Sequence, residues 1–288
     1  MVKCAKKFYP NIKKIYAPNN VYIALWNILL QEYPENYLHC LDVDEKTLNI
    51  ENVDHNISSV TNVRKIKRER PDLIIFEDAS EGYLGKYEGH MVGSEGEAST
   101  LSFNMNKHFT CGSGGAFCTN NKEMYEYINS FVKHGLTDKK FWYDREGHNY
   151  RLSNLNASLL WSQIEQVDKI MGLREKIFNS YKEKIKGLCE IQETSSNTEL
   201  SYWFVCLRIK GLKNYDTIES FFKNHNIELR PMFYNLQEFD HIPKIVFPEN
   251  SNAKLINNEN FIVPCYPSIT EREISRVVKV LKKFVTKI

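Results

Sequence analysis

The chain has 288 residues, of which 42% are hydrophobic, and it carries a formal net charge of +2. It is long enough to bury a sizeable core in one large domain or two smaller ones. No apolar run approaches the ~20 residues of a membrane span, the balanced charge gives no general nucleic-acid signal, and the lysine-rich start lacks an apolar signal core, so we expect a cytoplasmic protein.

The seven cysteines are irregularly spaced, and none forms a Cys-x-x-Cys pair. This pattern predicts neither a metal site nor a disulfide framework, and reduced thiols fit a cytoplasm. The dense basic run at 64–70 contains no aromatic residue. We interpret it as the solvated face of a helix rather than a phosphate-binding patch.

The first part of the chain alternates between helical and strand patterns. We expect helices over 1–9, 21–32 and 63–70, and strands over 14–18 and 37–43. The next segment, 72–76, has the continuous apolar pattern of a strand buried on both faces of a parallel sheet. Glu77 and Asp78 follow at the C-terminal end of this strand, where open α/β sheets bind their ligands.

The stretch 101–119, LSFNMNKHFTCGSGGAFCT, contains two short apolar runs separated by one lysine and a Gly-Ser-Gly-Gly turn. Because glycine adopts positive φ at little cost, the stretch predicts a reversal between two strands, with Lys107 just before the turn. Such a lysine is either a solvated surface charge or a nucleophile that binds a carbonyl cofactor. Taken alone, the stretch favours the surface charge, because most lysines are solvated.

The second half begins with a predicted helix over 122–132, an aromatic and charged loop over 134–149, and one long helix from 152 to about 186. Strands over 202–209, 227–231 and 261–264 and helices over 215–225 and 271–285 follow. This order is typical of a small α/β domain appended to a larger one. We therefore expect a large domain over 1–170 and a small C-terminal domain over 171–288.

Several motifs occur in a fixed order along the chain. They are Glu77-Asp78-Ala79-Ser80-Glu81, Ser102-Phe103-Asn104 before Lys107 and its glycine turn, His134-Gly135, the run 147–152 (GHNYRL), Arg230-Pro231, and Pro264-Cys265-Tyr266-Pro267. Together they resemble the sugar aminotransferases of the DegT/DnrJ/EryC1/StrS family from about Lys14 onward. The resemblance implies an α/β fold of the aspartate-aminotransferase type, fold type I of the PLP-dependent transferases. A large, mostly parallel sheet domain would bind the cofactor beside the small C-terminal α/β domain.

The resemblance implies catalytic roles for two residues. Pyridoxal 5′-phosphate (PLP) acts as an electron sink and needs a lysine to hold it and an acid against its ring nitrogen. Lys107 matches the lysine that binds the cofactor covalently and then moves a proton. Asp78 matches the acid that keeps the ring nitrogen protonated.

Four further positions match cofactor-binding residues of the family. Ser102 matches the serine that bonds the cofactor phosphate, and Tyr22 matches the aromatic residue that stacks on the ring, although an ordinary core aromatic remains an alternative. Asn149 matches an asparagine that reaches the neighbouring subunit's cofactor, which implies a homodimer with shared active sites. Glu81 stands where the family usually has Gln or His beside the ring hydroxyl.

The sequence also departs from the family pattern. The pattern includes an upstream Ser-Gly-Thr turn that grips the cofactor phosphate, and the printed sequence starts at about the helix after it. A helix and a strand of the pattern are also absent between Asn49 and His55, and the proline and histidine expected after Arg230 are replaced. We therefore expect an N-terminally shortened member with weakened cofactor affinity.

Two functions follow from the resemblance. The first is a PLP-dependent aminotransferase that moves an amino group from glutamate to a nucleotide-linked keto-sugar, in cell-surface polysaccharide or amino-sugar biosynthesis. The second is a catalytically weakened or inactive relative that acts as a binding or partner subunit. Related sugar dehydratases replace the lysine with histidine, so Lys107 favours amino transfer, and a chance match of motifs is the least favoured alternative.

Overall fold

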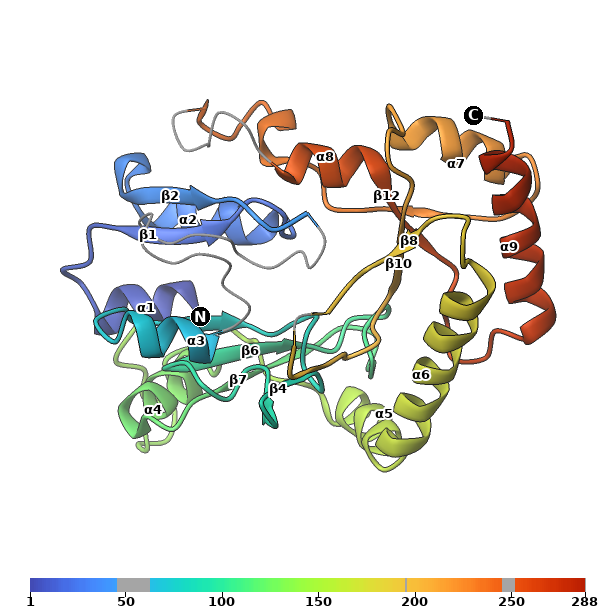
Figure 1. Ribbon diagram of the computed structural model, residues 1–288. Helices are drawn as coiled ribbons and strands as arrows, with labels where there is room; N and C mark the ends of the chain where they lie inside the picture. The colour runs from blue at the N-terminus through green and yellow to red at the C-terminus, as the bar shows by residue number, and fades with distance from the viewer. Residues whose placement is uncertain (46–62, 195, 245–251, 288) are drawn as a thin grey trace. The chain divides into compact units, whose positions relative to one another are not determined.

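The computed structural model describes residues 1–45, 63–194, 196–244 and 252–287 (Figure 1). The gap noted between Asn49 and His55 lies outside these residues. The chain forms two compact units, the first made of 1–12, 70–167 and 197–201, and the second of 13–69, 168–196 and 202–288. The chain passes from one to the other after Val167, near the predicted division at residue 170, and the assignment of two functional domains stays a prediction.

The first unit contains the sheet that carries Lys107. Its strand order is β3-β6-β7, formed by β3 (Phe76–Asp78), β6 (Ala98–Ser102) and β7 (Gly115–Cys118). Strands β3 and β6 are parallel, whereas β6 and β7 are antiparallel. The predicted reversal between two strands is therefore confirmed, and Lys107 lies in the connection between β6 and β7.

Two helices of the first unit pack together beside this sheet (Figure 1). They are α1 (Val2–Phe8) and α4 (Lys122–Phe131). Their buried contact contains Cys4, Ala98 and Met124, so β6 shares the same core. A second, small antiparallel sheet of the first unit joins β5 (His90–Met91), β4 (Lys86–Tyr87) and β9 (Thr198–Glu199), none of which was predicted.

The predicted strand over 72–76 is wrong in its position. Strand β3 begins only at Phe76, because its pairing with β6 begins with Phe76 opposite Ala98. Ile74 is 40% exposed, so the apolar run before the strand is not buried on both faces. The prediction that the strand delivers Asp78 at its end is nevertheless confirmed.

The single long helix predicted from residue 152 is also wrong. The structure has two helices, α5 (Asn154–Ile164) and α6 (Val167–Lys184). The amide of Gln166 donates to the carbonyl of Gln163, a bond to the third preceding residue, so the chain leaves the α-helical pattern there. Apolar residues at helical spacing continue across the break, and periodicity therefore did not reveal it.

The second unit contains two sheets. Strands β1 (Ile15–Pro18) and β2 (Leu38–Leu41) are parallel, and the other sheet has the order β11-β12-β10-β8 with antiparallel pairs. The latter strands are β8 (Glu190–Ile191), β10 (Val205–Arg208), β11 (Arg230–Pro231) and β12 (Asn260–Val263). The helices are α2 (Ala24–Glu32), α3 (Val63–Glu69), α7 (Tyr215–Lys223), α8 (Asn252–Glu259) and α9 (Glu271–Val285), with short 3₁₀ turns at Glu35–Tyr37 and Leu236–Glu238. Within the described ranges, no helix is long and apolar enough to cross a membrane.

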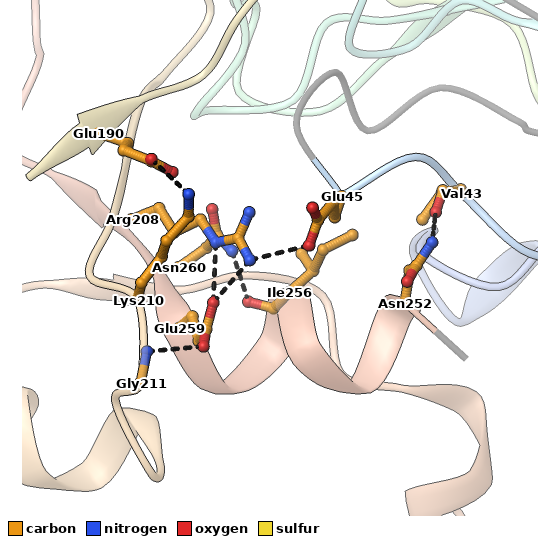
Figure 2. A network of polar contacts seen from close by, with 10 residues as sticks. All are labelled: Val43, Glu45, Glu190, Arg208, Lys210, Gly211, Asn252, Ile256, Glu259 and Asn260. Carbon is orange, nitrogen blue, oxygen red and sulfur yellow. Dashed lines mark hydrogen bonds and ion pairs between the residues drawn. The ribbon is translucent and has the colours of Figure 1, made fainter. Parts of the chain in front are cut away.

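A buried ionic cluster joins segments of the second unit that are far apart in sequence (Figure 2). The Arg208 guanidinium lies 2.8 Å from the Glu259 carboxylate and 3.0 Å from Glu45, and the side chains of Arg208 and Glu259 are only 8% and 9% exposed. Glu259 also accepts a 2.8 Å hydrogen bond from the Gly211 amide. The cluster thus connects the end of α8, the end of β10 and the segment after β2.

Replacing Glu259 with alanine should lower the free energy of unfolding by about 3 kcal/mol, because Arg208 would be left with an incompletely paired buried charge. Because Glu45 would still pair with Arg208, the expected loss of stability lies at the lower end of the range for broken buried ion pairs. The matched control is Glu190→Ala, which removes an exposed pair with Lys210 and should cost at most about 1 kcal/mol. Urea denaturation of both variants measures the free energies of unfolding. Equal losses in the two variants would contradict a stabilising role of the buried pair between Arg208 and Glu259.

Candidate active site

The candidate site lies at one edge of the β3-β6-β7 sheet. Parallel strands end at the same edge, and Asp78 at the end of β3 lies opposite Thr100 of β6. Ser102 is the last residue of β6, and the connection that carries Lys107 begins directly after it. The fold therefore brings Asp78, Ser102 and the Lys107 connection to the ligand-binding edge of an α/β sheet.

The two adjacent acids at the end of β3 have different environments. Glu77 is buried, and its carboxylate accepts hydrogen bonds from the amides of Gly93 (2.8 Å), Glu95 (2.8 Å) and Gly96 (2.6 Å). A Cβ at Gly96 would lie 2.7 Å from the carbonyl oxygen of Ile75, so the close approach of this segment needs glycine. Glu77 therefore fixes the segment that leads into β6.

Asp78 faces the other way and is exposed. Its Oδ1 accepts hydrogen bonds from the Ser80 amide (3.1 Å), the Ser80 hydroxyl (2.5 Å) and the Thr100 hydroxyl (3.4 Å). These contacts hold the carboxylate in one orientation. All three fall on Oδ1, and the N-terminal ammonium of Met1 also lies close enough to interact electrostatically with the carboxylate.

Lys107 is not a solvated surface charge, although its stretch taken alone favoured that interpretation. Its side chain is 10% exposed, and Nζ lies 3.1 Å from Oε1 of Glu81, whose side chain is 33% exposed. The main chain of Glu81 is held in turn, since its carbonyl accepts a hydrogen bond from the Ser201 hydroxyl. The amine is therefore held in a mostly buried place next to an acid that comes just after β3.

Ser102 and the glycine turn complete this edge of the sheet. The Ser102 hydroxyl oxygen accepts a weak 3.4 Å bond from the Asn104 amide, so the hydroxyl hydrogen can still be donated. Gly115 lies opposite Ser102 in the β6–β7 ladder, and a Cβ on it would lie 2.7 Å from the carbonyl oxygen of Leu101. The hairpin that carries Lys107 therefore requires glycine at this position.

The other two predicted residues, Tyr22 and Asn149, belong to neither the β3-β6-β7 sheet nor its connections. Tyr22 belongs to the second unit, where it precedes α2, is 61% exposed and meets the Phe233 ring edge-on at 6.4 Å. An ordinary core position is therefore excluded for Tyr22. Asn149 lies in the first unit on an exposed loop, and its Oδ1 accepts a 3.4 Å bond from Arg151. Their predicted contacts with the cofactor stay predictions.

The residues at the sheet edge fit PLP. Lys107 presents a shielded amine for its carbonyl, the oriented Asp78 carboxylate suits a protonated ring nitrogen, and the Ser102 hydroxyl can donate to a phosphate. Among these residues the Glu81 carboxylate is unusual for a PLP site, because it already pairs with the Lys107 amine that must react with the cofactor.

Sequence reasoning missed two features of this site. The role of Glu77 follows from strand alternation, since adjacent strand residues point to opposite sides and only one of two neighbouring acids can face a ligand. The side-chain amides of α5 that hold the connection after Lys107, from Asn156 and Gln163, lie about fifty residues later and gave no local signal.

Comparison with known proteins gives a consistent result. Residues 41–282 match the model of the DegT/DnrJ/EryC1/StrS aminotransferase family. GDP-perosamine synthase of Escherichia coli O157:H7 is 28% identical over 214 residues, which cover 74% of this chain and 58% of that protein. The chain spans about three fifths of the length of the first curated relatives it matches.

Solved structures show the same fold at low sequence identity. PseC of Helicobacter pylori, an aminotransferase involved in the biosynthesis of pseudoaminic acid, has a TM-score of 0.84 at 18% identity, covering 96% of this chain and 81% of PseC. Spr1654 of Streptococcus pneumoniae in its PMP form has a TM-score of 0.82 at 16% identity, covering 98% and 83%. The likeness confirms the predicted α/β fold of type I.

Proposed function

Because the chain belongs to the DegT/DnrJ/EryC1/StrS aminotransferase family, we propose that it is a PLP-dependent aminotransferase that acts on a nucleotide-linked keto-sugar with glutamate as the amino donor. The observation that carries this proposal is the mostly buried amine of Lys107 at the sheet edge where Asp78 ends β3. The match to an enzyme named GDP-perosamine synthase supports a nucleotide-linked substrate and a role in polysaccharide or amino-sugar biosynthesis.

Each residue of the site has a defined task in this proposal. When bound, PLP supplies an electron sink that stabilises negative charge on the substrate carbon. Lys107 would hold the cofactor through its amine and would move a proton at the substrate carbon. The Asp78 carboxylate would face the ring nitrogen, and the Ser102 hydroxyl would donate to the phosphate.

The donor half of the reaction tests the proposal without knowledge of the sugar. Glutamate added to PLP-loaded protein should release 2-oxoglutarate in an amount equal to the bound cofactor. A subsequent panel of keto-sugars, with GDP-linked sugars first, would identify the acceptor. Failure to release 2-oxoglutarate while PLP is bound would favour the second function, a family relative that acts as a partner subunit.

We also propose a cytoplasmic homodimer with shared active sites. Large apolar side chains of the first unit are exposed over the 141–150 loop and α5: Phe141, Trp142, Tyr143, Tyr150, Leu155, Leu159, Trp161 and Ile164. Exposed apolar side chains gathered on a loop and a helix often mark a protein interface, and Asn149 lies within the loop. Sedimentation equilibrium would measure the association, and a monomer at micromolar concentration would count against it.

Replacing Glu81 with glutamine should raise the affinity for PLP two- to tenfold, or by up to about 1.4 kcal/mol. The reason is that Nζ of Lys107 is paired with the Glu81 carboxylate at 3.1 Å, and this pair must break before the amine can bind the cofactor carbonyl. Part of the effect is screened, since Glu81 is one-third exposed. Titration with PLP, followed by visible absorbance, measures the affinity.

The matched control for Glu81→Gln is Glu199→Gln, which removes a carboxylate from the exposed pair with Lys86 in the same unit. Its affinity for PLP should equal that of the wild type. Weaker binding in Glu81→Gln than in this control would show that Glu81 supports the cofactor instead of competing for the lysine.

A further inference from the structure

The connection between β6 and β7, residues 103–114, holds Lys107 but contains no helix or strand. Its main chain is fixed by several separate bonds. The Lys107 amide donates to the Asn104 carbonyl (3.0 Å), and the Cys111 amide donates to the Phe103 carbonyl (3.1 Å). The Phe109 amide donates to the Tyr83 hydroxyl (3.3 Å). The main-chain amide and carbonyl of Thr110, three residues after Lys107, are bonded from outside the connection.

Gln163 of α5 satisfies both main-chain groups of Thr110. The Thr110 amide donates to Oε1 of Gln163 at 3.0 Å, and Nε2 of Gln163 donates to the Thr110 carbonyl at 2.7 Å. This exchange of two bonds has the pattern of a hydrogen-bonded pair in an antiparallel sheet. A carboxamide makes both bonds without a charge at neutral pH, because it carries a donor and an acceptor side by side.

Asn156 makes a second contact from the same side of α5. Its Nδ2 donates to the carbonyl of Cys111, while its Oδ1 accepts from the hydroxyl of Ser153, the helix N-cap. Asn156 and Gln163 are seven residues apart, so they share one helix face, and buried Leu160 lies between them on that face. The helix therefore presents two fixed amides to the connection that carries Lys107.

We propose that Gln163, with support from Asn156, is a positioning residue that holds the connection so that the Lys107 amine meets PLP in a productive orientation. This inference rests on the proposed function. Misplacement of a reacting group by about 1 Å costs on the order of 10²-fold in rate, and a connection without regular secondary structure needs such external bonds. Gln163 does not touch the cofactor in this proposal.

The first test variant keeps the size of the Gln163 side chain and removes one of its two hydrogen bonds to Thr110. In Gln163→Glu, the carboxylate can still accept from the Thr110 amide, but it cannot donate to the Thr110 carbonyl and repels it. The protonated carboxyl group can make both bonds again. PLP affinity relative to wild type at the same pH should therefore be reduced about tenfold near pH 8 and recover toward pH 5, where the carboxyl group gains a proton.

Two other variants complete the test. Gln163→Leu makes neither bond, so its affinity for PLP should be lower than that of the wild type both near pH 8 and near pH 5. Gln166 is an exposed residue just past α5, and its side chain donates to the Ser162 carbonyl. The variant Gln166→Glu should bind PLP as the wild type does at both pH values. Amide hydrogen exchange over 103–114 without PLP should be faster in both Gln163 variants near pH 8.

The outcomes separate the two proposals. Normal PLP binding in the wild type with unchanged affinity in both Gln163 variants would overturn the positioning role and leave the proposed function intact. Reduced affinity in Gln163→Glu that does not recover at low pH would overturn the pairing with Thr110. Absence of PLP binding in the wild type would overturn the proposed function, and the positioning role with it.

Discussion

Replacing Lys107 with alanine should abolish amino transfer and remove the visible absorbance of protein incubated with PLP. The variant loses the group that captures the cofactor and the group that moves the proton. Proton transfer alone contributes about 10²–10⁴-fold, so we expect the rate to fall by at least about 10³-fold. Spectroscopy on the purified variant and a glutamate-dependent assay measure the two losses separately.

Two controls distinguish chemistry from folding in this experiment. Lys107→Arg retains a positive charge for the Glu81 carboxylate, but the guanidinium does not act as an amine nucleophile, so this variant should be folded and inactive. Lys86→Ala removes an exposed lysine of the same unit and should retain activity and absorbance. A visible band of wild-type intensity in Lys107→Ala would show that another residue holds PLP.

Replacing Asp78 with asparagine should reduce the rate of amino transfer by about 10²–10³-fold while PLP still binds to Lys107. Loss of one preorganised electrostatic partner typically costs this much. The amide oxygen of asparagine can keep the Ser80 and Thr100 contacts of Oδ1, whereas its nitrogen replaces the Oδ2 acceptor. The ring nitrogen then loses its anionic partner.

The control for Asp78→Asn is Ser80→Ala, which removes the hydroxyl that bonds Oδ1 but leaves the carboxylate. Loss of that hydrogen bond should cost about 1 kcal/mol, or roughly fivefold in rate. If Asp78→Asn were no slower than Ser80→Ala, Asp78 would be a structural residue, and the ring nitrogen would have another partner.

The sequence predicted the strand reversal around Lys107 because the residues that indicate it are adjacent in the chain. A glycine turn between two apolar runs indicates a reversal, and β6, β7 and the position of Lys107 agree with that prediction. Family resemblance then selected Asp78 from two adjacent acids, and strand alternation explains the selection, since Glu77 accepts hydrogen bonds from the amides of Gly93, Glu95 and Gly96.

Contacts between distant segments could not be predicted in the same way. The pair between Lys107 and Glu81 and the two bonds between Gln163 and Thr110 depend on how separate elements pack. Likewise, Leu155 and Leu159 follow the spacing that is typical of a buried helix face, yet they are 72% and 51% exposed. Periodicity detects an apolar face but does not say whether its partner lies in the same chain.

One measurement tests the central claim most directly. Wild-type protein is incubated with PLP and reduced with borohydride, and its peptides are mapped by mass spectrometry. The account predicts that the cofactor mass appears on Lys107 in an amount that approaches one per chain, and that glutamate added before reduction lowers this amount. Cofactor found on other lysines, or on none, would contradict the assignment of Lys107.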